Sequence, residues 1–250
     1  MRALGIAAAF VLCGSVAQAT PSTVYWAPST PYLQPFGVLH VTYDTYFGDG
    51  AYPIDVGLTM GVLPFDKLQL EVGFDLFYPT ISGDEAMVFP IQLNAKVGTP
   101  EDKLFAGQPG WSVGIYAVGF EEDVNDYNIL YAMIGKTLGP AGTFSVGGYY
   151  GLNGDLMRNA SGGEARVGVM AGWSSPAIDV PLIDKLLLAA DVQSGDNAFG
   201  AVGGGVYFYF TPAIDLLTGP VYFFESSLQP GGSSWLWTLQ LDVDLNLASR

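Results

Sequence analysis

Hydrophobic and polar side chains alternate along most of the chain. The clearest stretch is residues 67–78, KLQLEVGFDLFY, where every second residue is apolar. A period of two is typical of a β-strand with one apolar and one polar face. Twelve segments with this pattern follow one another, at 37–47, 51–63, 67–78, 86–97, 110–120, 127–138, 143–151, 165–174, 185–194, 199–210, 213–225 and 234–247.

The apolar faces of these segments have no partner within the chain. Almost no stretch has the period of an amphipathic helix that could cover them, and no run of eighteen apolar residues predicts a membrane-spanning helix. Lipid is the remaining partner, and a closed barrel satisfies every backbone hydrogen bond without leaving an edge. The pattern therefore predicts an all-β fold, a transmembrane antiparallel up-and-down β-barrel of about 12 strands over residues 37–247, with a short tail at 248–250.

Pro220 interrupts the eleventh of these segments. Proline has no N–H to donate, and a closed barrel has no free edge strand on which that loss would be harmless. We therefore expect a β-bulge at Pro220.

The first residues have the features of a secretory signal peptide. Arg2 supplies a positive charge, residues 4–12 are apolar, and Ala17-Gln18-Ala19 matches a cleavage site. We expect cleavage near Ala19, so residues 1–19 are absent from the mature protein. The single cysteine, Cys13, lies within this segment, and the predicted mature chain then has no disulfide or thiolate chemistry. Export fits the outer membrane of a diderm bacterium.

Residues 20–36 are rich in proline, which opposes both helix and strand formation. We expect an extended N-terminal segment on the periplasmic side. The alternative is a small plug, in which Tyr25 and Trp26 bury their rings in the mouth of the barrel.

Aromatic residues fall near both ends of the predicted strands. In this strand order, Phe47, Tyr78, Tyr150 and Trp235 lie at one end, and Trp111, Trp173, Phe208 and Phe210 lie at the other. Two aromatic girdles are expected where a barrel meets the two membrane interfaces. Over residues 37–247 the chain resembles bacterial outer-membrane β-barrel proteins of the porin-like class. It departs from their frequent aromatic C-terminal residue, because it ends in Ala248-Ser249-Arg250.

The net charge of −15 excludes nucleic acid as a partner, because an acidic surface repels phosphates. The chain has one histidine and one cysteine, and it contains no nucleotide-binding loop, zinc cluster or haem motif, so we expect no metal and no cofactor. Lipid of the outer membrane and small hydrophilic solutes or ions are the expected partners.

The inward faces of the strands carry most of the charge. Glycines on these faces leave space for a narrow lumen. The predicted lumen-lining residues are His40, Asp44, Asp55, Glu71, Asp75, Lys96, Lys136, Arg166, Asp191, Asp215, Asp242 and Asp244. Rings of carboxylates favour cations in selective pores. The pattern predicts a narrow, acidic, cation-preferring passive channel, and the alternative is a structural or anchoring barrel whose lumen is filled and whose charges pair with one another.

Catalysis at the barrel rim is a further alternative. His40 and Asp44 share one face of a strand, but residues four apart on a strand are about 13 Å apart, so a general base would need a carboxylate from another strand. No motif supplies a nucleophile, and we predict that the protein is not an enzyme.

Overall fold

The computed structural model describes residues 23–50, 52–78 and 91–248. The predicted signal peptide and residues 86–90 of the fourth segment lie outside this range. The strands are β1 (Val38–Gly48), β2 (Ile54–Gly61), β3 (Gln69–Tyr78), β4 (Ile91–Thr99), β5 (Gly110–Val118), β6 (Ile129–Thr137), β7 (Thr143–Gly151), β8 (Val167–Ser174), β9 (Lys185–Gln193), β10 (Ala201–Thr211), β11 (Ile214–Phe223) and β12 (Trp235–Asn246).

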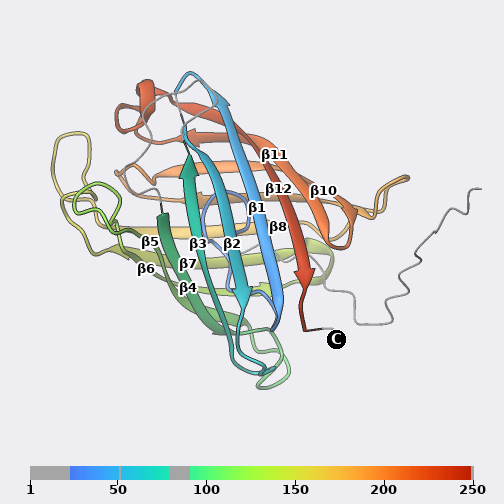
Figure 1. The fold of residues 1–250 in the computed structure, drawn as a ribbon. Helices are drawn as coiled ribbons and strands as arrows, with labels where there is room; N and C mark the ends of the chain where they lie inside the picture. Colours follow the sequence, from blue (N-terminus) through green and yellow to red (C-terminus); the bar gives the residue numbers. More distant parts are fainter. Residues whose placement is uncertain (1–22, 51, 79–90, 249–250) are drawn as a thin grey trace, which may run out of the picture.

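Each strand pairs antiparallel with its neighbours in sequence, and β1 pairs with β12 to close the sheet (Figure 1). The closing seam runs in continuous register from Val38 opposite Asn246 to Gly48 opposite Leu236. The predicted antiparallel barrel of twelve strands is therefore confirmed. Among the described connections, short 3₁₀ turns occur at Gly139–Ala141, Ser226–Leu228 and Pro230–Gly232. In the described part of the chain, no helix is long and apolar enough to cross a membrane.

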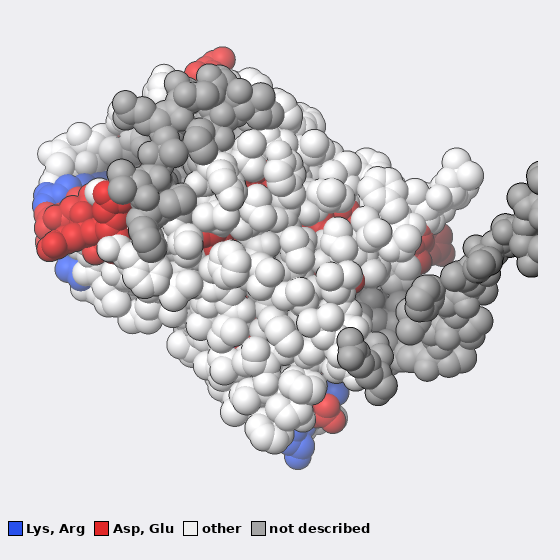
Figure 2. Space-filling model, in the orientation of Figure 1, with Lys and Arg blue, Asp and Glu red and all other residues white. Residues whose placement is uncertain are grey.

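The outer face of the barrel is apolar, as the alternation of the strands requires. Residues such as Val72, Leu93, Ile134 and Val146 point away from the interior and are exposed. Figure 2 shows that charged side chains gather near the two ends of the barrel and are rare on the wall between them.

The aromatic residues predicted for the girdles lie close to the strand ends. Phe47, Tyr78, Tyr150 and Trp235 are exposed near the end at which β1 finishes. Trp111 and Phe210 are exposed near the opposite end, where Trp173 and Phe208 are partly buried. Their contact with a membrane interface remains a prediction.

Two clusters of buried side chains fill part of the barrel. One includes Tyr207, Tyr209, Leu217 and Leu236 on β10, β11 and β12. The other includes Tyr131, Tyr149 and Met170 on β6, β7 and β8, together with residues of the surrounding loops. Since these side chains point inward, the half of the barrel formed by β5 to β11 is largely packed.

The predicted bulge at Pro220 is wrong. The β10–β11 register is the same on both sides of this residue, with Gly203 opposite Val221 and Val206 opposite Thr218. The two intervening pairs are missing from this ladder, which agrees with the absent proline N–H. A register shift occurs instead near the end of the hairpin, between Tyr209 and Thr211.

Candidate functional site

The N-terminal segment, residues 23–36, lies inside the barrel (Figure 1). It follows the inner wall from β3, where the backbone N–H of Gln34 donates to Glu71 at 2.8 Å, to β12, where Gln240 donates to the carbonyl of Tyr25 at 3.3 Å. The extended segment expected outside the barrel is thus replaced by the internal plug that was its alternative. The physical reason is that the segment carries apolar rings and unpaired backbone donors, and the lumen provides partners for both.

A single carboxylate holds the middle of this segment. Asp191 on β9 accepts hydrogen bonds from the backbone N–H groups of Tyr25, Trp26 and Ala27 at 2.9 to 3.2 Å. The hydroxyl of Ser29 donates to the same carboxylate at 2.7 Å. Asp191 is 4 % exposed, so these donors replace the water that a buried carboxylate would otherwise need.

Tyr25 fits against a wall of glycines on β10 and β11. A Cβ atom at Gly203 would lie 2.5 Å from the ring, at Gly205 2.8 Å from the ring, and at Gly219 2.7 Å from the phenol oxygen. The ring is 1 % exposed. These glycines are therefore needed for the close approach of the N-terminal segment to the wall.

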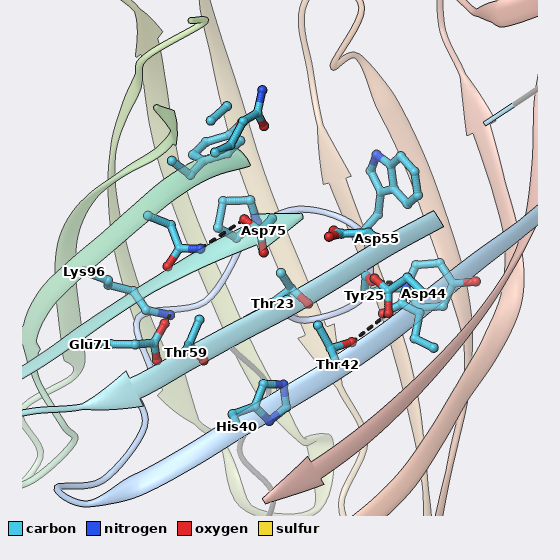
Figure 3. Close-up of a pocket in the computed structure, with 18 of the residues that line it drawn as sticks. Thr23, Tyr25, His40, Thr42, Asp44, Asp55, Thr59, Glu71, Asp75 and Lys96 are labelled. Carbon is cyan, nitrogen blue, oxygen red and sulfur yellow. Dashed lines mark hydrogen bonds and ion pairs between the residues drawn. The ribbon is translucent and has the colours of Figure 1, made fainter. Parts of the chain in front are cut away.

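A cavity of about 310 Å³ remains between the segment and the wall formed by β1 to β4. Thr23, Trp26 and Pro28 of the segment line it together with residues of the strands. Figure 3 shows Thr23 among the lining residues of β1, β2 and β3. Charged, hydroxyl and aromatic side chains all contribute to the lining of this cavity. It is the candidate functional site.

Three aspartates project into this cavity from neighbouring strands. Asp44 on β1 is the direct register partner of Asp55 on β2, and Asp75 on β3 lies two residue pairs further along the β2–β3 ladder, opposite Gly57. Thr42 donates to Asp44 at 2.7 Å and Asn94 donates to Asp75 at 3.0 Å (Figure 3). Oδ1 of Asp55 is buried and accepts no hydrogen bond from the described residues.

Two basic side chains also line the cavity, and each is held by carboxylates. The Lys96 ammonium lies 3.8 Å from Glu71, and Lys96 is 2 % exposed. Nδ1 of His40 lies 2.7 Å from Asp244 and Nε2 lies 3.5 Å from Asp242. Within the described part of the chain, the three aspartates above have no basic partner of this kind, so the negative charge of the cavity is concentrated beside them.

Aromatic rings form much of the remaining lining. Trp26 packs edge to face on Tyr46, with ring centroids 5.7 Å apart. Across the cavity, Tyr116 packs edge to face on Tyr131 at 5.7 Å and on Phe199 at 6.0 Å. The site therefore combines carboxylates with aromatic faces and edges.

The predicted lumen residues fall into three groups. Those that line the cavity are His40, Asp44, Asp55, Glu71, Asp75, Lys96 and Asp242. Asp191, Asp215 and Asp244 point inward and are buried, but they lie outside the cavity lining. Asp215 is the direct register partner of Asp242, and Asp244 contacts His40. Lys136 and Arg166 lie elsewhere.

The prediction is wrong for Lys136, which lies on the outward face of β6. It pairs in register with Phe144, a residue 44 % exposed on the outer surface. Its ammonium bends over the barrel end to Asp102 and Glu101, each at 3.0 Å. The hydrogen bond from Lys136, together with the N–H of Gly107, lowers the pKa of the Asp102 carboxyl.

The prediction is also wrong for Arg166. Its guanidinium donates to the carbonyls of Gly151 and Leu152 and lies 4.7 Å from the ring centroid of Tyr150. These partners belong to the end of β7 and the loop that follows it. Arg166 precedes β8, so its alternation pattern did not determine its direction as it would within a strand.

Sequence reasoning missed the aromatic side of the cavity. Tyr116 and Tyr131 lie on inward faces, and their alternation with outward residues could have identified them. Phe199 lies in the loop before β10, where no periodic signal exists. Within the described residues, no group of three or more His, Cys, Asp or Glu side chains is arranged to hold a metal ion.

A comparison with solved structures shows which known architecture this barrel resembles. The NanC porin superposes with a TM-score of 0.54 at 10 % sequence identity, covering 83 % of this chain and 100 % of that protein. This chain has the fold of an outer-membrane porin. An outer membrane channel from Pseudomonas putida F1 gives a TM-score of 0.49 at 14 % identity, with coverage of 94 % of this chain and 100 % of that protein. Neither a protein-family model nor a characterised protein sequence matches this porin-like chain.

Proposed function

We propose that the protein is a narrow passive channel for small hydrophilic solutes in an outer membrane, with a preference for cations. The observation that carries this proposal is the cavity between the N-terminal segment and β1 to β4, where Asp44, Asp55 and Asp75 have no basic partner among the residues that the structure describes. Carboxylates that face a confined path attract cations and repel anions. The porin fold supports a transport role, because water-filled lumens are common in barrels of this kind.

The competing proposal of a filled, structural barrel rests on the packed half of the lumen. Two clusters with many aromatic rings, which include Val24, Tyr25 and Ala27 of the N-terminal segment, occupy the space near β5 to β12. The cavity on the opposite side is lined by charged and hydroxyl side chains, and a purely structural interior would pair or omit such groups. This contrast favours the channel.

A hydrolytic role for His40 has less support. Asp242 and Asp244 on β12 are the carboxylates from another strand that a catalytic His40 would need. Both ring nitrogens face these carboxylates, which leaves neither of them directed at a nucleophile. We assign His40 a charge-balancing role beside these two aspartates.

Planar-bilayer recording under a salt gradient tests the proposal. We expect discrete conductance steps and a reversal potential on the cation side. Replacing Asp44, Asp55 and Asp75 together by Asn should move the reversal potential towards zero, because the unpaired charge of the cavity is removed. Asp179→Asn is the matched control, since Asp179 is exposed in the β8–β9 loop and should leave selectivity unchanged. Unchanged selectivity in the triple variant, or a folded barrel without conductance, would overturn the proposed channel.

A further inference from the structure

We propose that the cavity binds a small organic cation, a substituted ammonium group with an apolar body. This inference rests on the proposed function and names the class of solute that the site selects. Three features of the same cavity carry it, which are an unpartnered carboxylate, a set of aromatic rings and a matching size. Each one excludes a different alternative ligand.

The carboxylate feature calls for a ligand that carries a positive charge or donates a hydrogen bond. Oδ1 of Asp55 is buried and accepts no hydrogen bond from the described residues. Its register partner Asp44 places a second carboxylate beside it. A buried carboxylate oxygen without a partner costs free energy, which a bound cation or a donor N–H group would recover. An anion or a purely apolar solute does not meet this requirement.

The nearby basic side chains do not supply a positive charge to Asp55 either. Lys96 is directed at Glu71, and His40 lies between Asp242 and Asp244. Figure 3 shows Asp44 and Asp55 on one side of the cavity and the pair of Glu71 and Lys96 on the other. Among the described residues, no basic side chain is placed to balance Asp55, and a bound cation would supply that charge.

The aromatic feature distinguishes an organic cation from an inorganic ion. Trp26 and Tyr46 line the cavity beside Asp44, and the Tyr46 hydroxyl donates to Asp44 at 3.4 Å. Tyr116, Tyr131 and Phe199 line it from β5, β6 and the loop before β10. Aromatic faces attract substituted ammonium groups, and they also provide apolar contact for the carbon atoms attached to the nitrogen. A small inorganic ion keeps its water shell and gains little from such rings.

The size of the cavity sets an upper limit on the ligand. Sites for small molecules commonly measure about 300–1,000 Å³. At about 310 Å³ the cavity is at the lower end, which suits an amine with a few carbon atoms and excludes an oligosaccharide or a peptide.

Choline and its uncharged isostere 3,3-dimethylbutan-1-ol provide matched probes, because they differ in charge and hardly in shape. Binding is measured on the folded protein in detergent micelles by calorimetry, at constant ionic strength. We expect choline to bind at least tenfold more tightly than the isostere. Asp55→Asn and Trp26→Leu should each weaken choline binding at least fivefold.

Two control variants alter the same two residue types away from the cavity. Asp179→Asn removes an exposed loop carboxylate, and Trp237→Phe alters a ring on the outer face of β12. Both should bind choline like the parent protein. If Trp26→Leu disturbs the N-terminal segment, Tyr46→Leu removes a cavity ring from the barrel wall and should weaken choline binding to a similar degree.

The outcomes separate this inference from the proposed function. Equal affinity for choline and the isostere, or choline affinity unaffected by Asp55→Asn and by both ring variants, would overturn the organic-cation site. Cation-selective potassium conductance without choline binding would do the same and leave the channel standing. Choline binding that depends on Asp55 and on the rings, in a barrel that passes no current, would support the site and overturn the channel.

Discussion

The Ser29 hydroxyl donates a hydrogen bond of 2.7 Å to Asp191, which lies 162 residues further along the chain. This contact joins a segment outside the barrel strands to the inner face of β9. Three backbone N–H groups of the same segment converge on the same carboxylate. One side chain therefore holds the internal segment in place, and its loss has a defined consequence.

Asp191→Ala should release residues 23–36 from the wall. The substitution leaves the N–H groups of Tyr25, Trp26 and Ala27 without their acceptor, and each unsatisfied donor costs about 1–3 kcal/mol if it stays buried. We expect faster proteolysis of the segment and a severalfold increase in single-channel conductance. Asp184→Asn, at the rim beside Lys185, is the control. Unchanged conductance together with unchanged proteolysis would contradict the anchoring role.

The contact between Tyr25 and Gly203 predicts non-additive effects of mutation. Gly203→Ala should lower the free energy of unfolding by about 1–3 kcal/mol, because the added Cβ lies 2.5 Å from the ring. In a Tyr25→Ala background the same substitution should cost almost nothing. Urea unfolding in lipid vesicles measures both. The control is Gly204→Ala, whose Cβ would approach Ala189 and Ala190 at 3.2 Å, so its effect should not depend on Tyr25.

Lys96→Met should increase cation preference. It removes a buried positive charge from the cavity lining and leaves Glu71 without its partner at 3.8 Å. The reversal potential under a salt gradient should move further to the cation side, while Glu71→Gln should move it in the opposite direction. The variant should also be less stable, by up to about 3–5 kcal/mol, because a buried charge loses its counterion. A shift towards anions in Lys96→Met would contradict this assignment of charge.

The loop at residues 100–109 should resist acid. The hydrogen bond from Lys136 and the N–H of Gly107 lower the pKa of Asp102 in the folded state, whereas an unfolded aspartate titrates near 3.9. The stabilisation is fully present above the unfolded pKa and is lost only as the pH falls through the lower folded value.

Hydrogen exchange of the Gly107 amide measures this behaviour, because that N–H donates to Asp102 at 2.7 Å. Its protection should persist at pH 4 and decrease at lower pH. In Asp102→Asn, the exchange free energy should no longer change with pH in this range. Protection lost well above pH 4 in the parent protein would show that the pKa of Asp102 is not lowered.

The alternation of residues determined most of the fold. Strands such as β7 and β12 have a regular period of two, and the structure places them within a residue of their predicted bounds. The period of two and the closure of the barrel also determine which side chains point inward. These two features together bring Asp44, Asp55 and Asp75 close to one another.

The two failures, at Lys136 and Arg166, have different causes. Lys136 lies on the outward face of β6, which its alternation with Met133 and Gly135 indicates, so the wrong face was assigned to it. Arg166 lies before β8, where the period has not begun and local hydrogen bonds decided its direction.

The internal segment could not be predicted with the same arguments. Residues 23–36 have no regular period, and their position depends on contacts with strands more than 160 residues away in sequence. The glycines that receive Tyr25 carried a signal, because Gly203, Gly205 and Gly219 leave space on the inner faces of β10 and β11. The sequence does not show which side chain fills that space.

The β1–β12 seam places a condition on the order of assembly. Residues 23–36 directly precede β1, yet they contact β9, β10 and β12 inside the closed wall. The seam joins the first and the last of the described strands, and its pairing encloses residues 23–36. A segment not yet inside when the seam forms can enter only through an end of the barrel. Bulky groups attached near Tyr25 should therefore slow maturation more than they weaken the finished barrel.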